Sequence, residues 1–107
     1  REIATYHVSM EFAVLYRLRG GVDRARAMEA FPRHQAYYQA FHAVGQGLIA
    51  LGPFLTPDPT AGSMGIFSSR DAAERFIADD PFTTEGLADA RILEWNAVWL
   101  DGDPGPR

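Results

Sequence analysis

The spacing of hydrophobic residues changes along the chain, and this change constrains the fold more than any other feature of the sequence. Residues 11–17, EFAVLYR, and residues 91–100, RILEWNAVWL, alternate with a period of two, which is typical of half-buried β-strands. Residues 32–44 instead carry apolar side chains at helical spacing, and Pro32 suits the first helical position. The sequence therefore predicts a strand near each end of the chain, with helical structure between them.

Glycines divide the first half of the sequence. Gly20 and Gly21 end the first predicted strand, and residues 22–31 are expected to be a polar connection, with one helical turn as an open alternative. Gly45 and Gly47 follow the predicted helix, as is usual at helix C-termini.

The second half contains two more predicted strands and a second helix. Residues 48–55 and 63–67 are predicted strands on either side of the turn-rich loop TPDPTAG. Ser68 or Ser69 is expected to cap a helix that Pro81 stops. The segment TTEGL offers one further helical turn before the last strand.

The predicted order β-α-β-β-α-β indicates a ferredoxin-like α+β fold, with a four-stranded antiparallel sheet and both helices on one face. We expect one domain over residues 1–107, with a core at about 11–100 and a flexible tail at 101–107. The other sheet face also carries apolar residues, and self-association about a two-fold axis would bury them. A homodimer or larger homo-oligomer is therefore expected.

Composition excludes several classes of function. A net charge of −4 gives no attraction for phosphate backbones, so nucleic acid is not an expected partner. No apolar run approaches the ~20 residues that span a bilayer, and the first residues lack the layout of a signal peptide, so no membrane association is expected. With 0 cysteines, thiolate chemistry is excluded and a cytoplasmic location is the default expectation.

His34 is the histidine with the most informative position. On a helical wheel it lies about 20° from Phe41 and about 40° from Tyr38, so it is expected to point toward the sheet. If the helix begins at Pro32, two residues before His34, the helix dipole favours the neutral imidazole and a role as a base. A buried histidine satisfied by a backbone carbonyl is the structural alternative. His7 and His42 are expected at the periphery.

Asp79 and Asp80 precede Pro81 at the end of a predicted helix, where the dipole disfavours carboxylates. The residue before a proline avoids helical dihedral angles, so Asp80 is expected to lie outside the helix and to cap the next turn. Asp79 is expected to be solvated. Capping is compatible with catalysis, because one carboxylate oxygen can cap while the other orients an imidazole.

Three segments together resemble the YCII-related domain family: RHQAYYQAFHAVGQGLIALGPF, DAAERFIADDPFTTEGL and ILEW. The resemblance covers roughly residues 11–99, and ADDPFTTEGL is its most distinctive part. It implies a ferredoxin-like fold, assembly into a dimeric α/β barrel, and an active site built on His34 and Asp80. Other matching positions are Tyr37, Phe82, Gly86 and Trp95. The departures, the connection at 19–31 and the tail after Leu100, affect the substrate more than the fold.

Two functional hypotheses stay open at this stage. The first is a small-molecule enzyme, a lyase or isomerase without a cofactor, in which His34 is the acid or base and Asp80 fixes its tautomer. The candidate substrate-binding residues are Tyr16, Arg33, Tyr37 and Phe82. The second is a non-catalytic ligand-binding or accessory module that uses the same pocket, which the lack of nucleophile or cofactor motifs supports.

Several residues keep alternatives of their own. A metal site on His34 and Asp80 is the weaker option, because a catalytic metal usually needs three protein ligands. Arg33 could meet an anionic substrate or be a solvated charge. For Trp95 and Trp99, plain packing is the expectation.

Overall fold

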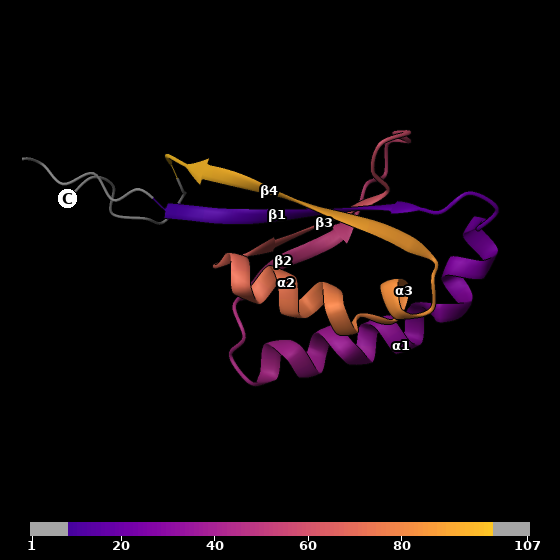
Figure 1. The fold of residues 1–107 in the computed structure, drawn as a ribbon, viewed down its shortest axis with the longest axis horizontal. Coiled ribbons are helices and arrows are strands. Elements are labelled where there is room, and N and C mark those ends of the chain that lie inside the picture. The colour runs from indigo at the N-terminus through magenta and orange to yellow at the C-terminus, as the bar shows by residue number, and fades with distance from the viewer. Residues whose placement is uncertain (1–8, 100–107) are drawn as a thin grey trace, which may run out of the picture.

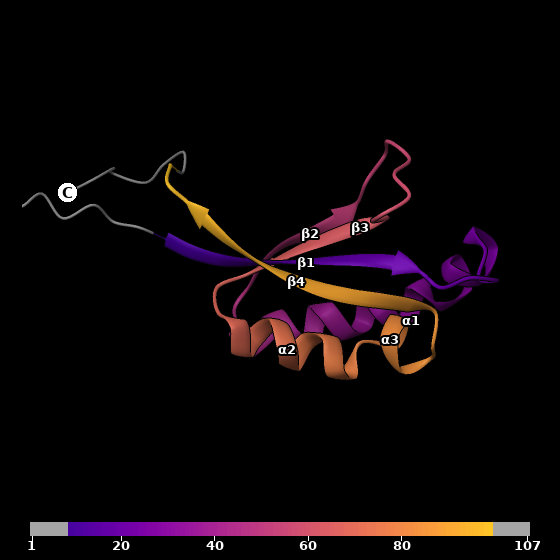
Figure 2. The same cartoon turned by 45° about the horizontal axis from the view of Figure 1, so that its top comes forward.

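The computed structural model describes residues 9–99 and confirms the ferredoxin-like α+β fold. The elements, in chain order, are β1 (Ser9–Leu18), α1 (Arg24–Ala43), β2 (Leu48–Pro53), β3 (Ser63–Phe67), α2 (Arg70–Asp79), α3 (Pro81–Thr84) and β4 (Ala88–Ala97). The strands form one antiparallel sheet in the order β2-β3-β1-β4. The helices all lie on one face of this sheet (Figures 1 and 2). The predicted tail at 101–107 lies outside the described residues.

The central strand β1 pairs with both β3 and β4. Its pairing with β4 runs from Ser9 opposite Ala97 to Leu18 opposite Ala88. The first strand therefore extends beyond the predicted range 11–17 at both ends. The last strand starts and ends earlier than the predicted range 91–100. The early start of β4 follows from Gly86, whose φ of 73° turns the chain out of α3 toward the sheet.

The start of α1 is the largest departure from the sequence prediction. The helix begins at Arg24 rather than Pro32, and its N-cap Asp23 accepts a hydrogen bond of 2.9 Å from the backbone nitrogen of Arg26. Residues 24–30 consist mainly of Ala, Arg, Met and Glu, which favour helix. The expected polar connection is therefore mostly helix, because a good N-cap and strong helix formers precede the proline.

Pro32 lies inside α1, where it removes one backbone hydrogen bond. Pro32 and Met28, four residues earlier, are both exposed, so water is available to the carbonyl group that the proline leaves unpaired. His34 consequently lies in the middle of the helix. The expectation that the helix dipole favours its neutral form is wrong, because that effect falls off within the first turn.

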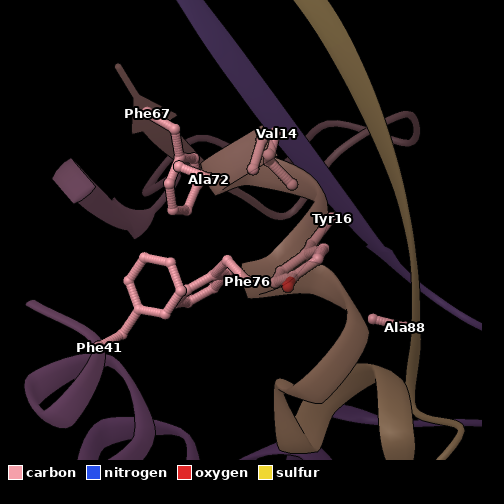
Figure 3. Close-up of a cluster of buried hydrophobic side chains, with 8 residues drawn as sticks. Val14, Tyr16, Phe41, Phe67, Ala72, Phe76 and Ala88 are labelled. Carbon is pink, nitrogen blue, oxygen red and sulfur yellow. The ribbon is translucent and has the colours of Figure 1, made fainter. Parts of the chain in front are cut away.

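One hydrophobic cluster joins the helices to the sheet (Figure 3). The ring of Phe76 on α2 is its centre, with centroid distances of 4.9 Å to Phe67, 5.0 Å to Tyr37 and 5.1 Å to Phe41. The buried members of the cluster are Val14, Tyr16, Phe41, Phe67, Ala72, Ala73, Phe76 and Ala88. Tyr16 brings a polar hydroxyl into this cluster, and buried hydroxyls need a partner.

The sheet face opposite the helices remains open in the single chain. Ala90 and Ile92 of β4 pack toward the core, so the alternate residues Leu93 and Trp95 point to the other face, where they are 44% and 49% exposed. Trp99, beyond β4, is 75% exposed, so the expected packing of the two tryptophans is not made within one chain. An open apolar hollow adjoins this face, lined by Ala50, Leu51, Gly52, Pro53, Phe54, Met64 and Ile66. In the described part of the chain, no helix has both the length and the apolar character needed to cross a membrane.

Candidate active site

Three elements that are distant in the sequence bring His34, Asp80 and Tyr16 together. His34 is buried on α1, Asp80 is the single residue between α2 and α3, and Tyr16 is buried on β1. Asp80 has φ −67° and ψ 130°, the extended conformation expected before Pro81. The proline thus breaks the helix at the residue whose side chain reaches α1.

The contact between His34 and Asp80 is short and buried. Nδ1 of His34 lies 2.8 Å from Oδ1 of Asp80, and the two side chains are 8% and 0% exposed. An ionised carboxylate only accepts hydrogen bonds, so Nδ1 carries the proton when Asp80 is ionised. Within residues 9–99, Nε2 has no hydrogen-bond partner. No described residue therefore engages its lone pair.

Aromatic rings fix the orientation of the His34 imidazole. Phe82 stacks on it, with a centroid distance of 4.2 Å and an interplanar angle of 15°. Tyr38, at 5.2 Å, and Phe76, at 6.4 Å, meet it edge-on, and Phe31 lies tilted at 6.0 Å. The candidate residue Phe82 therefore lies beside His34, and its ring already covers one face of the imidazole.

Asp80 caps α3, as predicted. Its Oδ1 atom lies 3.3 Å from the backbone nitrogen of Phe82. We expected one oxygen to cap and the other to hold the imidazole, but Oδ1 serves both groups. Oδ2 instead accepts a hydrogen bond of 2.6 Å from the hydroxyl of Tyr16. No spacing in the sequence links Tyr16 to Asp80, because they lie 64 residues apart on different elements.

Both candidate tyrosines donate their hydroxyl protons within the protein. Burial, followed by the charge and the hydrogen bond of Asp80, raises the pKa of the Tyr16 hydroxyl above its ordinary value. Tyr37 donates to the backbone carbonyl of Phe76 at 3.0 Å, at the end of α2. Burial, with smaller contributions from Asp79 and Asp80, raises the pKa of Tyr37 to about 12. Tyr37 thus ties α1 to α2, and its hydroxyl makes no contact with His34.

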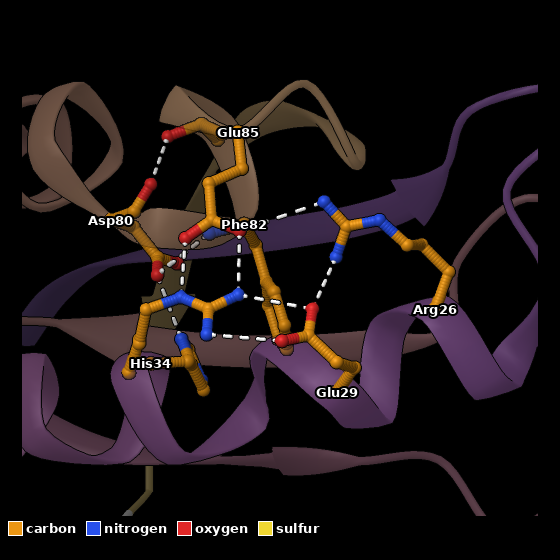
Figure 4. A network of polar contacts seen from close by, with 8 residues as sticks. Arg26, Glu29, His34, Asp80, Phe82 and Glu85 are labelled. Atoms are coloured by element: carbon orange, nitrogen blue, oxygen red, sulfur yellow. Dashed lines mark hydrogen bonds and ion pairs between the residues drawn. The ribbon is translucent and has the colours of Figure 1, made fainter.

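Arg33 lies in a surface network of ion pairs beside the buried contact (Figure 4). Its guanidinium group contacts both carboxylate oxygens of Glu85, at 2.7 and 2.8 Å, and both of Glu29, at 3.2 and 3.3 Å. Arg26 joins the same two glutamates, at 2.7 Å to Glu29 and 3.8 Å to Glu85. Arg33 is therefore already neutralised, which weakens its case as a binding group for an anionic substrate.

This network was not predicted from the sequence. The spacings of Arg26 to Glu29 and of Glu29 to Arg33 are those of neighbours on a helix, so an earlier helix start would have predicted two of the pairs. Glu85 had no such signal, because it comes from the end of α3.

His42 is not placed beside His34 by the structure, and no third ligand for a metal is found among residues 9–99. His42 is exposed, as expected, and His7 lies outside the described residues. Among residues 9–99, no group of three or more His, Cys, Asp or Glu side chains is placed to hold a metal ion.

One solved structure similar to this chain is an enzyme, 5-chloro-2-hydroxyhydroquinone dehydrochlorinase from Burkholderia phenoliruptrix, in complex with 2,5-dihydroxybenzoquinone. The two share 26% identity and a TM-score of 0.60, over 79% of this chain and 92% of the enzyme. The neighbour thus links this fold to chemistry on a small molecule.

A second solved structure, a hypothetical protein from Arabidopsis thaliana, shares 14% identity and a TM-score of 0.51, over 91% of this chain and 95% of that protein. This likeness shows the fold alone. No curated protein matches the sequence. The family model for the YCII-related domain matches residues 10–96. The chain therefore belongs to the YCII-related domain family.

Proposed function

We propose that this protein is a small-molecule enzyme in which His34 is a general acid–base and Asp80 orients it, without a cofactor. The reaction class is elimination, dehydration or isomerisation. The observation that carries the proposal is the 2.8 Å contact between Nδ1 of His34 and Oδ1 of Asp80, which leaves Nε2 without a partner among residues 9–99.

This arrangement suits proton transfer at Nε2. A carboxylate that accepts from Nδ1 fixes the tautomer with a basic Nε2 and stabilises the imidazolium that forms when Nε2 takes a proton. In an elimination, Nε2 takes the proton of a substrate C–H or O–H bond, and the electron pair of that bond joins the new π system. The leaving group departs as an anion with the electron pair of its own bond. The imidazolium then returns its proton to solvent or to the product.

The similar enzyme suggests a class of substrate. Its name describes a dehydrochlorination, the loss of a proton and a chloride, and its structure holds a planar dihydroxybenzoquinone. The rings around His34 could stack on such a planar molecule, as Phe82 already does on the imidazole. We therefore propose compact hydroxylated aromatic or quinoid rings as the first substrates to test.

A screen of chlorinated and hydroxylated hydroquinones, followed by absorbance and by chloride release, tests the function. Replacement of His34 by Ala should lower turnover by ~10² to 10⁴-fold, the usual contribution of general acid–base catalysis. His42→Gln is the matched control, because it changes an exposed histidine of the same helix. Unchanged turnover in His34→Ala would exclude the assignment, and recovery of a tightly bound, unchanged compound would favour the ligand-binding module.

We also propose that the protein is a homodimer, which would bury the exposed apolar face that includes Leu93 and Trp95. Sedimentation equilibrium at micromolar concentration tests this, and a monomer would contradict it. A Trp95→Glu variant should shift the equilibrium toward monomer, since it places a charge on that face. The cytoplasmic location stays a prediction from the sequence.

A further inference from the structure

We propose that Tyr16 is a positioning residue: its hydroxyl holds Asp80 as a carboxylate and thereby keeps the proton of His34 on Nδ1. The catalytic consequence rests on the proposed function, whereas the tautomer itself does not. Tyr16 is a substrate-binding candidate from the sequence, and its contact with Asp80 points to a different role.

The hydrogen bonds of Asp80 support an ionised side chain. Its Oδ1 atom faces two donors, Nδ1 of His34 at 2.8 Å and the backbone nitrogen of Phe82 at 3.3 Å, and Oδ2 faces the hydroxyl of Tyr16 at 2.6 Å. An ionised carboxylate accepts from all three groups, whereas a protonated one would have to donate to Nδ1 of His34 and would force the opposite tautomer on the imidazole. Three donors stabilise a buried charge that would otherwise be costly.

Tyr16 is the one hydroxyl donor of the three and the only donor to Oδ2 among the described residues. Its side chain is buried, and Asp80 is fully buried, so water cannot easily replace the bond. The same surroundings keep the hydroxyl protonated, because burial raises the pKa of Tyr16. Tyr16 therefore donates at all working pH values, and its proton is committed to Asp80 rather than to a substrate.

The consequence reaches His34 through Asp80. With Oδ2 satisfied by Tyr16, the carboxylate keeps a fixed rotamer that presents Oδ1 to Nδ1, and the neutral imidazole then carries its lone pair on Nε2. Without Tyr16, Oδ2 would be buried without a donor. The carboxylate could then rotate away from Nδ1, and the imidazole would no longer be restricted to one tautomer.

Nuclear magnetic resonance of ¹⁵N-histidine-labelled protein tests the inference without a substrate. At a pH where His34 is neutral, we expect a protonated, pyrrole-like Nδ1 and a pyridine-like Nε2, with a downfield Nδ1–H resonance. Tyr16→Phe should shift or broaden this resonance and move both nitrogens toward averaged values. Tyr37→Phe is the matched control, because it removes a hydroxyl that bonds to backbone instead of Asp80, and it should leave the His34 signals in place. Unchanged His34 signals in Tyr16→Phe would overturn the inference.

A second measurement covers the case in which Tyr16→Phe does not fold. In the unmodified protein, the Tyr16 hydroxyl proton should exchange slowly with solvent and show a nuclear Overhauser contact to its own ring. A rapidly exchanging, unobserved hydroxyl proton would also overturn the inference.

Turnover separates this inference from the proposed function. Once a substrate is known, Tyr16→Phe should lower kcat by about 10- to 100-fold, the usual effect of a lost hydrogen bond to a charged group, with little change in KM. A raised KM with kcat unchanged would instead return Tyr16 to substrate binding. If His34→Ala keeps its turnover while Tyr16→Phe still changes the His34 signals, the proposed function fails and the role of Tyr16 stands.

Discussion

Two neighbouring residues of α1, Arg33 and His34, contact acidic residues at the two ends of α3 in opposite surroundings. His34 meets Asp80 with side chains that are 8% and 0% exposed, whereas Arg33 meets Glu85 with side chains that are 46% and 26% exposed. The distances are similar, at 2.8 and 2.7 Å. Similar geometry therefore has different consequences at the two places, because water can replace a lost partner at the surface but not in the interior.

The largest expected difference follows from removing each acidic partner. Asp80→Ala leaves the buried polar atoms of His34 and Tyr16 without an acceptor and removes the cap of α3, so the free energy of unfolding should fall by about 3–5 kcal/mol. Urea denaturation followed by circular dichroism measures this loss. Asp79→Ala is the matched control, since it changes an exposed neighbour. A loss for Asp80→Ala as small as that of the control would mean that the buried contact stabilises the protein no more than a surface residue does.

A smaller effect is expected at the ring of Phe82, which covers the buried contact. Phe82 is half-buried, stacks on His34 and meets Tyr16 edge-on at 6.4 Å. Phe82→Leu keeps apolar volume but loses these ring contacts, so the free energy of unfolding should fall by about 0.5–1.5 kcal/mol. The same denaturation experiment measures it, with Phe54→Leu as an exposed control. Equal effects of the two variants would argue against a specific role of the stacked ring.

The contribution of the surface network to the melting temperature should be small and should depend on the salt concentration. Glu85→Gln should shift the melting temperature by less than about 4 °C at low ionic strength, because exposed ion pairs contribute little. The shift should disappear in 1 M salt, where charges are screened over about 3 Å. Thermal melts across a salt series measure this. A larger shift that persists in salt would mean that the network behaves like the buried contact.

The smallest expected effect is the loss of the surface ion pairs at low pH. Hydrogen bonds from Arg33 lower the pKa of both Glu29 and Glu85 below their ordinary value of 4.5. A carboxyl group with a lowered pKa in the folded state contributes stability above its unfolded pKa and loses it as the pH falls through the folded pKa. The difference in melting temperature between the unmodified protein and Glu85→Gln should therefore be constant above pH ~5 and vanish progressively below about 4.5. A difference that grows toward low pH would contradict this sign.

Sequence reasoning predicted the parts of the molecule that local patterns determine. The order of strands and helices follows from periodicity and from Pro81, and the position of Asp80 follows from the restriction that a proline places on the residue before it. His34 also lies on the predicted, buried side of α1, although the predicted start of the helix was wrong. The phase of a helix does not depend on where the helix begins.

The rest could not be read from one sequence, for two physical reasons. The start of α1 depends on competition between Pro32 and the strong helix formers before it, which a local rule about proline resolves wrongly. The hydrogen bond of Tyr16 and the ion pair of Arg33 with Glu85 join elements 64 and 52 residues apart, so only the folded topology brings them together.

The pairing of β1 with β3 and β4 has a consequence for how the protein is made. The central strand is synthesised first, but both of its partners follow much later, at residues 63–67 and 88–97. Both edges of β1 therefore stay unpaired while the chain emerges. Tyr16, on this strand, can bond to Asp80 only after residue 80 has been synthesised. Contacts between distant residues form slowly, and an open strand edge invites pairing with other chains. A chain that ends before Ala88 is thus expected to aggregate. Because β1 carries Tyr16 and needs β4 as its partner, the contact between Tyr16 and Asp80 should form stably only after β4 has been synthesised.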